Sequence, residues 1–189
     1  MPDAEQGRIL PPIARAAISC ALNVPCQVDE SAPWLAEPGA CFVTLTRHGG
    51  LRGCIGSLQA HRSLLADVKG NAVAAALHDS RFPPLALAEL DSTKIEISVL
   101  SPTREMSFRD EADALAQLRP GVDGIVFEYL NRRSTYLPQV WEHYSQPRQF
   151  LASLKNKAGL PGDFWDDGVK LSRYTVTKWG EAEPGLEAG

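Results

Sequence analysis

The chain has 189 residues, of which 44% are hydrophobic and 22% charged, and its formal net charge is −4 at pH 7. This composition is typical of a globular protein, and the acidic balance argues against nucleic-acid binding, which requires a basic surplus. No apolar run approaches the roughly 20 residues that span a bilayer, and the acidic N-terminus does not resemble a signal peptide. We therefore expect a cytoplasmic protein without a membrane partner.

The first expected element is an amphipathic helix. Apolar residues recur at helical spacing from Ile9 to Val24, with Pro12 in the expected first turn, and Pro25 ends the pattern. Cys20 lies on the apolar stripe of this helix and Cys41 lies in an apolar strand, so we expect both thiols to be buried. The four cysteines form no Cys-x-x-Cys pair, which predicts reduced thiols and no metal site.

A hairpin, a helix and a strand are expected next. The strand 41–47 and the return strand 51–58 flank His48-Gly49-Gly50, a sequence suited to a tight turn. An amphipathic helix follows over about 64–76, and the residues 93–100 alternate as a half-exposed strand.

The second half of the chain repeats this order. After a short helix at 110–118, a hairpin is expected over 124–137, a helix from about Pro147, and a final strand over 170–179. The two sets are offset by about 80 residues, which indicates a structural duplication. We predict an α+β fold in which the duplicated hairpin–helix–strand units share one curved, largely antiparallel sheet flanked by helices, because one small unit buries too little surface to be stable alone.

The densest chemical signal is the segment Leu51 to Gly56. Gly53 and Gly56 lie inside a strand, where glycine marks a bulge or a close approach to the backbone. In a regular strand Arg52 and Cys54 share a face, and a guanidinium beside a thiol favours the thiolate. Cys54 is therefore a candidate nucleophile with Arg52 as its electrostatic partner. The alternative is that the small residues only allow a helix to pack closely.

Other polar residues add candidates for ligand binding. Arg81 lies in a proline-bounded turn and could hold an anion with two hydrogen bonds, or could tie the turn to backbone carbonyls. Gln139 follows the return strand of the second hairpin. If the repeats are related by an approximate twofold, Arg52, Cys54, Arg81 and Gln139 converge on one concavity.

Several other functions find no support in the sequence. No histidine is placed as a general base for Cys54. The sequence has no phosphate loop, no dinucleotide fingerprint and no His-Glu-x-x-His helix, so no cofactor is predicted. The basic residues of the second half are expected to form a solvated face; they are Arg132, Arg133, Arg148, Lys155 and Lys157.

The chain resembles the AMMECR domain family, known in bacteria and archaea as AmmeMemoRadiSam system protein A. The resemblance rests on five segments in order, which begin at Cys41, Leu51, Asp79, Ile95 and Leu137. The string Leu-Arg-Gly-Cys-Ile-Gly is the most specific, and Ser80 replaces the family's usual proline.

The composition of residues 181–189 predicts a disordered tail, and this resemblance implies one AMMECR-type domain over 1–180, with sub-units at about 40–101 and 121–180. It also implies association with a Memo-type protein, which resembles non-haem iron dioxygenases, and with a radical SAM enzyme. It supplies no reaction, so whether the chain is an enzyme stays open.

Three functions are compatible with these residues. The first is an accessory subunit that acts with the two partners through a groove at the Leu-Arg-Gly-Cys-Ile-Gly motif. The second is an enzyme in which Cys54 attacks an anionic small substrate. The third is a small-molecule binding module in which Gly53, Gly56, Arg81 and Gln139 contact the ligand.

Overall fold

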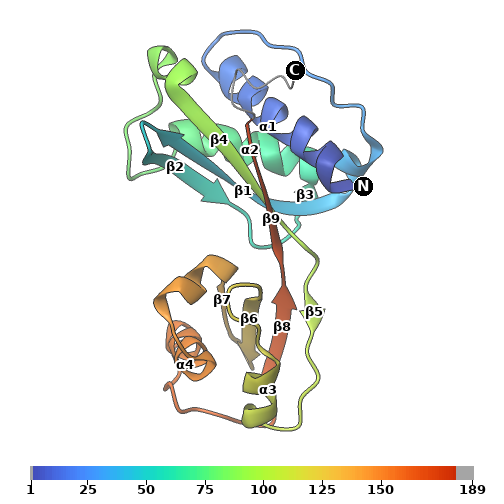
Figure 1. The fold of residues 1–189 in the computed structure, drawn as a ribbon, viewed down its shortest axis with the longest axis vertical. Coiled ribbons are helices and arrows are strands. Elements are labelled where there is room, and N and C mark those ends of the chain that lie inside the picture. The colour runs from blue at the N-terminus through green and yellow to red at the C-terminus, as the bar shows by residue number, and fades with distance from the viewer. Residues whose placement is uncertain (1, 182–189) are drawn as a thin grey trace, which may run out of the picture. The chain divides into compact units, whose positions relative to one another are not determined.

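Residues 2–181 are described by the computed structural model, and they form two compact units (Figure 1). Unit 1 contains residues 2–100 and 177–181, and unit 2 contains residues 101–176. Each unit combines helices with an antiparallel sheet, which confirms the α+β class. Of the predicted disordered tail at 181–189, Glu181 is described and pairs with Arg15, whereas residues 182–189 lie outside the described residues. No helix within residues 2–181 has both the length and the apolar character needed to cross a membrane.

The strands form two sheets instead of the single continuous sheet that we predicted. One sheet has five strands in the order β2-β1-β4-β9, with β3 paired to β1, and the other has four strands in the order β5-β8-β6-β7. Each sheet has its own hydrophobic core. The single-sheet prediction fails because each set of helices buries the apolar face of its own hairpin.

Unit 1 is a sheet with two helices on one face. Its elements are α1 (Pro2–Ala21), η1 (Pro33–Ala36), β1 (Pro38–Arg47), β2 (Gly50–Gly56), β3 (Arg62–Ser63), α2 (Leu64–Leu77), η2 (Leu87–Ser92), β4 (Thr93–Leu100) and β9 (Val176–Gly180). Helix α2 packs on β1 and β2, and α1 packs on α2 and β4. The alternation of β1 directs Val43 and Leu45 into this core, where neither is exposed. Phe42 and Thr44 therefore lie on the opposite face of the sheet.

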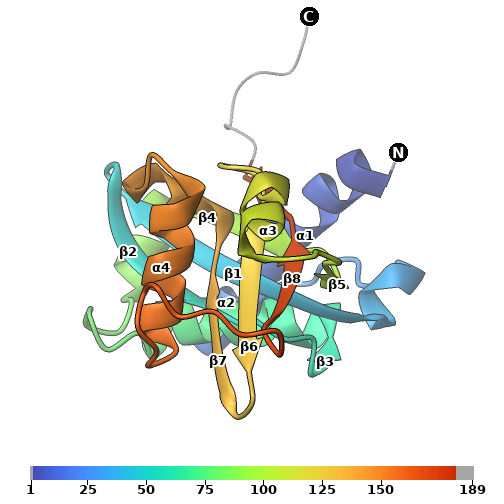
Figure 2. The same cartoon turned by 90° about the horizontal axis from the view of Figure 1, so that it is seen from below.

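Unit 2 repeats the plan with different helices. Its elements are β5 (Arg104–Glu105), α3 (Glu111–Gln117), β6 (Gly124–Tyr129), β7 (Arg132–Tyr136), η3 (Pro138–His143), α4 (Pro147–Lys157) and β8 (Lys170–Tyr174). Helices α3 and α4 lie on the same face of the sheet (Figure 2). Phe150 of α4 is fully buried and stacks on Trp141 with ring centroids 3.7 Å apart.

The two units share an order of elements and a pattern of strand pairing. In unit 1 the hairpin β1–β2 precedes α2, and β4 then pairs antiparallel with β1. In unit 2 the hairpin β6–β7 precedes α4, and β8 pairs antiparallel with β6. The repeat read from the sequence is present at the level of topology.

Two predicted elements differ from the structure. The first helix begins at Pro2 and not near Ile9, so Pro12 lies inside it. The final strand, predicted as continuous over 170–179, is divided between the two sheets: β8 ends at Tyr174, and β9 begins at Val176 in the sheet of unit 1. Strand alternation alone did not show that the chain changes sheets at Thr175.

Candidate functional site

Strand β2 carries the Leu-Arg-Gly-Cys-Ile-Gly motif and is bulged at Arg52. Leu51 and Gly53 pair with consecutive residues of β1, so Arg52 between them has no partner in the ladder. An extra residue interrupts the alternation of side chains. The bulge therefore breaks the regular alternation that would place Arg52 and Cys54 on one face of the sheet. The prediction that Arg52 is the electrostatic partner of the Cys54 thiol depended on that alternation.

The guanidinium of Arg52 is bound by a carboxylate that sequence reasoning missed. Its Nε and Nη2 donate to the two oxygens of Glu89 in η2, each at 3.1 Å. Arg52 is 9% exposed and lies over the ring of Phe82, 5.9 Å from its centroid. Arg47 also donates to Glu89, at 3.2 Å. The charge of Arg52 is thus compensated by Glu89, and this pair fastens β2 to η2.

The hydrogen bonds to Glu89 favour its ionised form. The Arg52 guanidinium, assisted by the backbone N–H of Ala86 and the charge of Arg47, lowers the pKa of Glu89 to about 2. The lower pKa means that the folded state binds a proton at Glu89 less readily than the unfolded chain does. The stabilisation is complete above the ordinary glutamate pKa and is lost as the pH falls through about 2.

We expect unit 1 to lose stability as the pH is lowered from about 4.5 to about 2. The variant Glu89→Gln should be less stable than wild type at neutral pH and should lose less stability over this interval. Urea unfolding at a series of pH values measures both effects. Glu96→Gln, on the face of the sheet opposite the core, is the matched control and should keep the pH dependence of wild type. An unchanged pH dependence in Glu89→Gln would show that Glu89 does not contribute.

Cys54 lies on the face of the sheet opposite the core. It pairs with Thr44 of β1, and its Sγ lies 3.4 Å from the Thr44 hydroxyl. The side chain is half-buried. Thr44 in turn pairs with Glu96 of β4, so the three residues form a row across the sheet. Within residues 2–181, no histidine or carboxylate is hydrogen-bonded to this thiol.

Asp79 and Arg81 brace the backbone at Cys54. Asp79, 6% exposed, accepts the N–H of Cys54 at 3.0 Å through Oδ2. Arg81 donates from Nε and Nη2 to the same carboxylate, at 3.0 and 2.7 Å, and its Nη2 also donates to the carbonyl of Cys54 at 3.3 Å. Arg81 therefore lies next to Cys54, while the convergence of Arg52, Cys54, Arg81 and Gln139 on one concavity stays a prediction. The same hydrogen bond to the Cys54 carbonyl also ties the turn of Arg81 to the backbone, which was the predicted alternative.

The charge of this cluster is fixed by the same bonds. The Arg81 guanidinium first, and then the Cys54 N–H, hold the pKa of Asp79 well below its usual range. Both carboxylate oxygens are occupied by N–H donors, so Asp79 is not available as a base. The Arg81 side chain is 53% exposed, and it therefore presents a cation to solvent beside the thiol. We call Thr44, Cys54, Asp79 and Arg81 the Cys54 cluster.

The two glycines of the motif have contacts within the chain. A Cβ on Gly53 would lie 2.1 Å from the carbonyl oxygen of Ala75 in α2. A Cβ on Gly56 would lie 2.2 Å from Cγ of Phe42, its cross-strand partner. Helix α2 and Phe42 therefore occupy the space that the two glycines leave free. This is the alternative in which the small residues only allow close packing.

The remaining sequence candidates are placed differently from one another. Gln139 lies in η3 of unit 2. Cys41 is fully buried, as predicted, and burial strongly raises the pKa of its thiol. Cys20 is exposed, and that prediction was wrong. The last turn of α1 borders an open cavity of about 740 Å³, also lined by Cys26, instead of packed core.

The basic face predicted for unit 2 also needs one correction. Lys155 is fully buried, not solvated, and its ammonium pairs with Glu111 of α3 and lies 5.4 Å from the ring centroid of Trp165. The one-letter pattern could not show this because the partner comes from a helix about 40 residues earlier.

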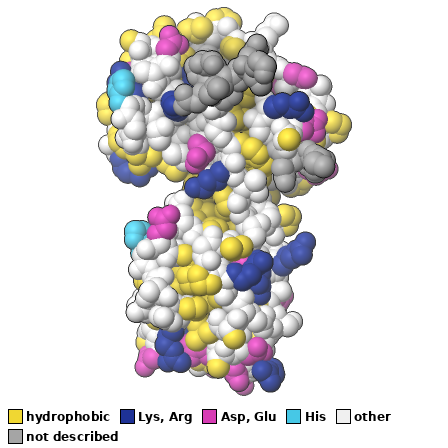
Figure 3. Space-filling view, in the orientation of Figure 1, with side chains coloured by type: hydrophobic (Ala, Val, Ile, Leu, Met, Phe, Trp, Pro, Cys, Tyr) yellow, Lys and Arg dark blue, Asp and Glu magenta, His cyan; other side chains and the backbone are white. Residues whose placement is uncertain are grey.

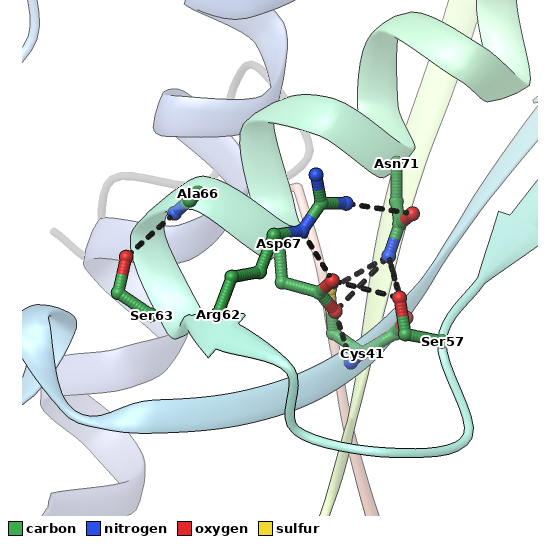
Figure 4. A network of polar contacts seen from close by, with 7 residues as sticks. All are labelled: Cys41, Ser57, Arg62, Ser63, Ala66, Asp67 and Asn71. Atoms are coloured by element: carbon green, nitrogen blue, oxygen red, sulfur yellow. Dashed lines mark hydrogen bonds and ion pairs between the residues drawn. The ribbon is translucent and has the colours of Figure 1, made fainter.

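A second polar network joins α2 to the same hairpin (Figure 4). Asp67, 1% exposed, accepts hydrogen bonds from the Cys41 N–H at 2.8 Å, the Ser57 hydroxyl at 2.7 Å and Arg62 Nε at 2.8 Å. Asn71 donates to the Cys41 carbonyl at 3.0 Å. The donors and acceptors satisfy one another, so this network holds the helix on the sheet.

The repeated α+β units and the motif on β2 define an AMMECR-type chain. The family model described as AMMECR1 matches residues 12–179, and the chain belongs to the AMMECR1 family.

Relatives of known sequence and structure agree with this assignment. Protein MJ0810 of Methanocaldococcus jannaschii is 37% identical over 185 residues, covering 95% of this chain and 92% of that protein. A protein of Thermotoga maritima is 36% identical and covers 80% of this chain and 84% of its own length. The crystal structure of the uncharacterized protein PH0010 from Pyrococcus horikoshii matches with a TM-score of 0.76 and 33% identity, over 95% of this chain and 93% of that one.

Proposed function

We propose that this protein is an accessory subunit that acts with a Memo-type protein and a radical SAM protein, and that it meets a partner through the surface around the Cys54 cluster. The observation that carries the proposal is the state of Asp79. Both its oxygens accept hydrogen bonds from N–H groups of Cys54 and Arg81. Asp79 therefore holds the Cys54 backbone and the Arg81 side chain in fixed positions at the surface, and it does not act as a base for the Cys54 thiol.

The exposed groups beside this cluster suit a protein partner. Arg81 presents a half-exposed guanidinium whose position is fixed by Asp79, and Leu51, three residues before Cys54 on β2, is 46% exposed. A fixed cation and an exposed aliphatic side chain around one motif suit an interface whose partner contributes a carboxylate. The family association implied by the sequence names the candidates for that partner.

The proposal is tested by mixing the full chain with a purified Memo-type protein and a purified radical SAM protein and measuring complex formation by sedimentation. We expect a complex with at least one of them, weakened at least tenfold by Arg81→Glu, since a reversed rim charge opposes the partner's carboxylate. Arg109→Glu, whose side chain is 86% exposed in unit 2, is the control and should leave binding unchanged. Absence of a complex with either partner contradicts the proposal.

A second candidate function is a cysteine nucleophile that acts on an anionic small substrate. The observation in its favour is that Arg81, whose side chain is 53% exposed, donates to the Cys54 carbonyl at 3.3 Å and so places a cation next to the residue that carries the thiol. Anionic and neutral alkylating reagents separate the two functions, because a cation beside a reactive thiolate attracts the anionic one.

The alkylation experiment uses Cys20→Ser/Cys26→Ser protein, because both of those thiols are exposed. If Cys54 is a nucleophile, iodoacetate should modify it faster than the buried Cys41, and Arg81→Gln should slow iodoacetate more than iodoacetamide. If the chain is an accessory subunit, Cys54 should react slowly with both reagents, and a bound partner should protect it further.

A further inference from the structure

Unit 2 contains a cavity of about 310 Å³ that is lined by three arginines. It lies where β5 and β8 meet the segment after α3, and its lining residues all belong to unit 2; they are Ser101, Pro102, Arg104, Arg119, Arg173, Tyr174 and Thr175. Basic side chains are also visible on this face of unit 2, around β5 and β8 (Figure 3). The cavity has the size of a small-molecule site at the lower end of the usual range.

Two of the three arginines share one carboxylate. Asp123, which is not exposed, accepts Arg119 Nε at 3.0 Å and Nη2 at 2.6 Å through the same oxygen. Arg173 Nη1 lies 3.5 Å from the other oxygen. One negative charge therefore faces two positive charges, and the Arg119 side chain is still 53% exposed.

The third arginine adds a charge that no residue of the described chain compensates. Arg104 is exposed, and its side chain has no hydrogen bond or ion pair within residues 2–181. It lies directly opposite Arg173 in the β5–β8 ladder, and like charges at such positions destabilise a sheet. The next residue, Glu105, pairs with Ser172 and so belongs to the other face of the strand.

We propose that this cavity is an anion site that binds a compact dianion, either a phosphoryl group or a short dicarboxylate. Three guanidinium groups and one carboxylate leave a local charge of about +2, which a dianion neutralises. Guanidinium groups hold phosphate and carboxylate oxygens through paired N–H donors. A bound dianion also removes the repulsion between Arg104 and Arg173. The site belongs to unit 2, so it is independent of the function proposed for the Cys54 cluster.

The test is calorimetric titration of the full chain with inorganic phosphate and, separately, with succinate, at one ionic strength set with sodium chloride. We expect saturable binding of one equivalent of at least one of them, and the better binder distinguishes a phosphoryl site from a dicarboxylate site. Arg104→Gln should weaken binding at least tenfold, while Arg104→Lys should retain part of the affinity. Arg109→Gln removes a charge elsewhere in unit 2 and should bind like wild type.

The test uses Arg104 because its side chain has no structural partner among the described residues. Without ligand, the melting temperature of Arg104→Gln should therefore equal or exceed that of wild type. Arg119→Gln and Arg173→Gln would leave Asp123 buried with fewer donors and could unfold the unit. No heat of binding with either anion, or equal affinity in Arg104→Gln and wild type, would overturn the proposal.

Discussion

Replacing Gly53 by alanine is expected to destabilise unit 1 by about 1–3 kcal/mol or more, the usual cost of overpacking a well-packed core. The added Cβ would lie 2.1 Å from the carbonyl oxygen of Ala75. The obstructing atom belongs to the backbone of α2, so a change of rotamer cannot relieve the contact. Either the helix or the bulged strand must move, and Arg52 moves with the strand. Urea unfolding followed by circular dichroism measures the loss.

The matched control is Gly50→Ala in the same strand. A Cβ there would lie 3.6 Å from the carbonyl oxygen of Arg47, an ordinary contact, and the change in the free energy of unfolding should stay within about 0.5 kcal/mol. If Gly53→Ala is as stable as Gly50→Ala, α2 does not pack on the motif as described, and the glycine is free for another role.

The substitution Glu111→Gln is expected to destabilise unit 2 by about 2–3 kcal/mol. Removing one partner of a buried ion pair typically costs about 3–5 kcal/mol, and the lower figure allows for the 30% exposure of the Glu111 side chain. The loss arises because the ammonium of Lys155, whose side chain is 1% exposed, keeps its burial and loses its counter-charge. Chemical denaturation of wild type and variant provides the comparison.

A second substitution separates loss of charge pairing from loss of packing. Lys155→Met keeps most of the volume of the side chain and removes the buried charge, so it should be neutral or stabilising, as hydrophobic replacements of buried ion pairs often are. The double variant should then show little further cost for Glu111→Gln. A large cost for Lys155→Met alone would mean that contacts of the ammonium with Trp165 and the Gly162 carbonyl, and not its pairing with Glu111, dominate.

The elements of this fold could be predicted from sequence where the signal is local. Residues that are close along the chain are enough to predict the hairpin turns, the strand at Thr93–Leu100 and the apolar stripe of α2. The prediction of one sheet failed because sheet membership depends on which strands meet, and strand alternation carries no information about that partner.

For the candidate site too, local signals could be predicted from sequence and long-range contacts could not. Cys54 and Arg81 could be found because a specific motif and a proline-bounded turn mark them. Asp79 was visible as part of that turn, but its bond to the Cys54 N–H joins residues 25 positions apart. Glu89 lies in a short 3₁₀ helix with no motif around it, and its partner Arg52 is 37 positions away. Only the spatial arrangement reveals that this glutamate neutralises the arginine of the motif.

The division of the last two strands between the units has a consequence for the order in which the chain acquires its structure. Strand β9 belongs to the sheet of unit 1, yet it is synthesised after residues 101–175 of unit 2. On the ribosome, unit 2 can close its own core while unit 1 still lacks an edge strand next to β4 and the Glu181 carboxylate that binds Arg15. Domains generally fold as they emerge from the N-terminus. Here the edge of β4 stays unpaired while residues 101–175 are synthesised, so the N-terminal unit completes its sheet only after unit 2 has been made.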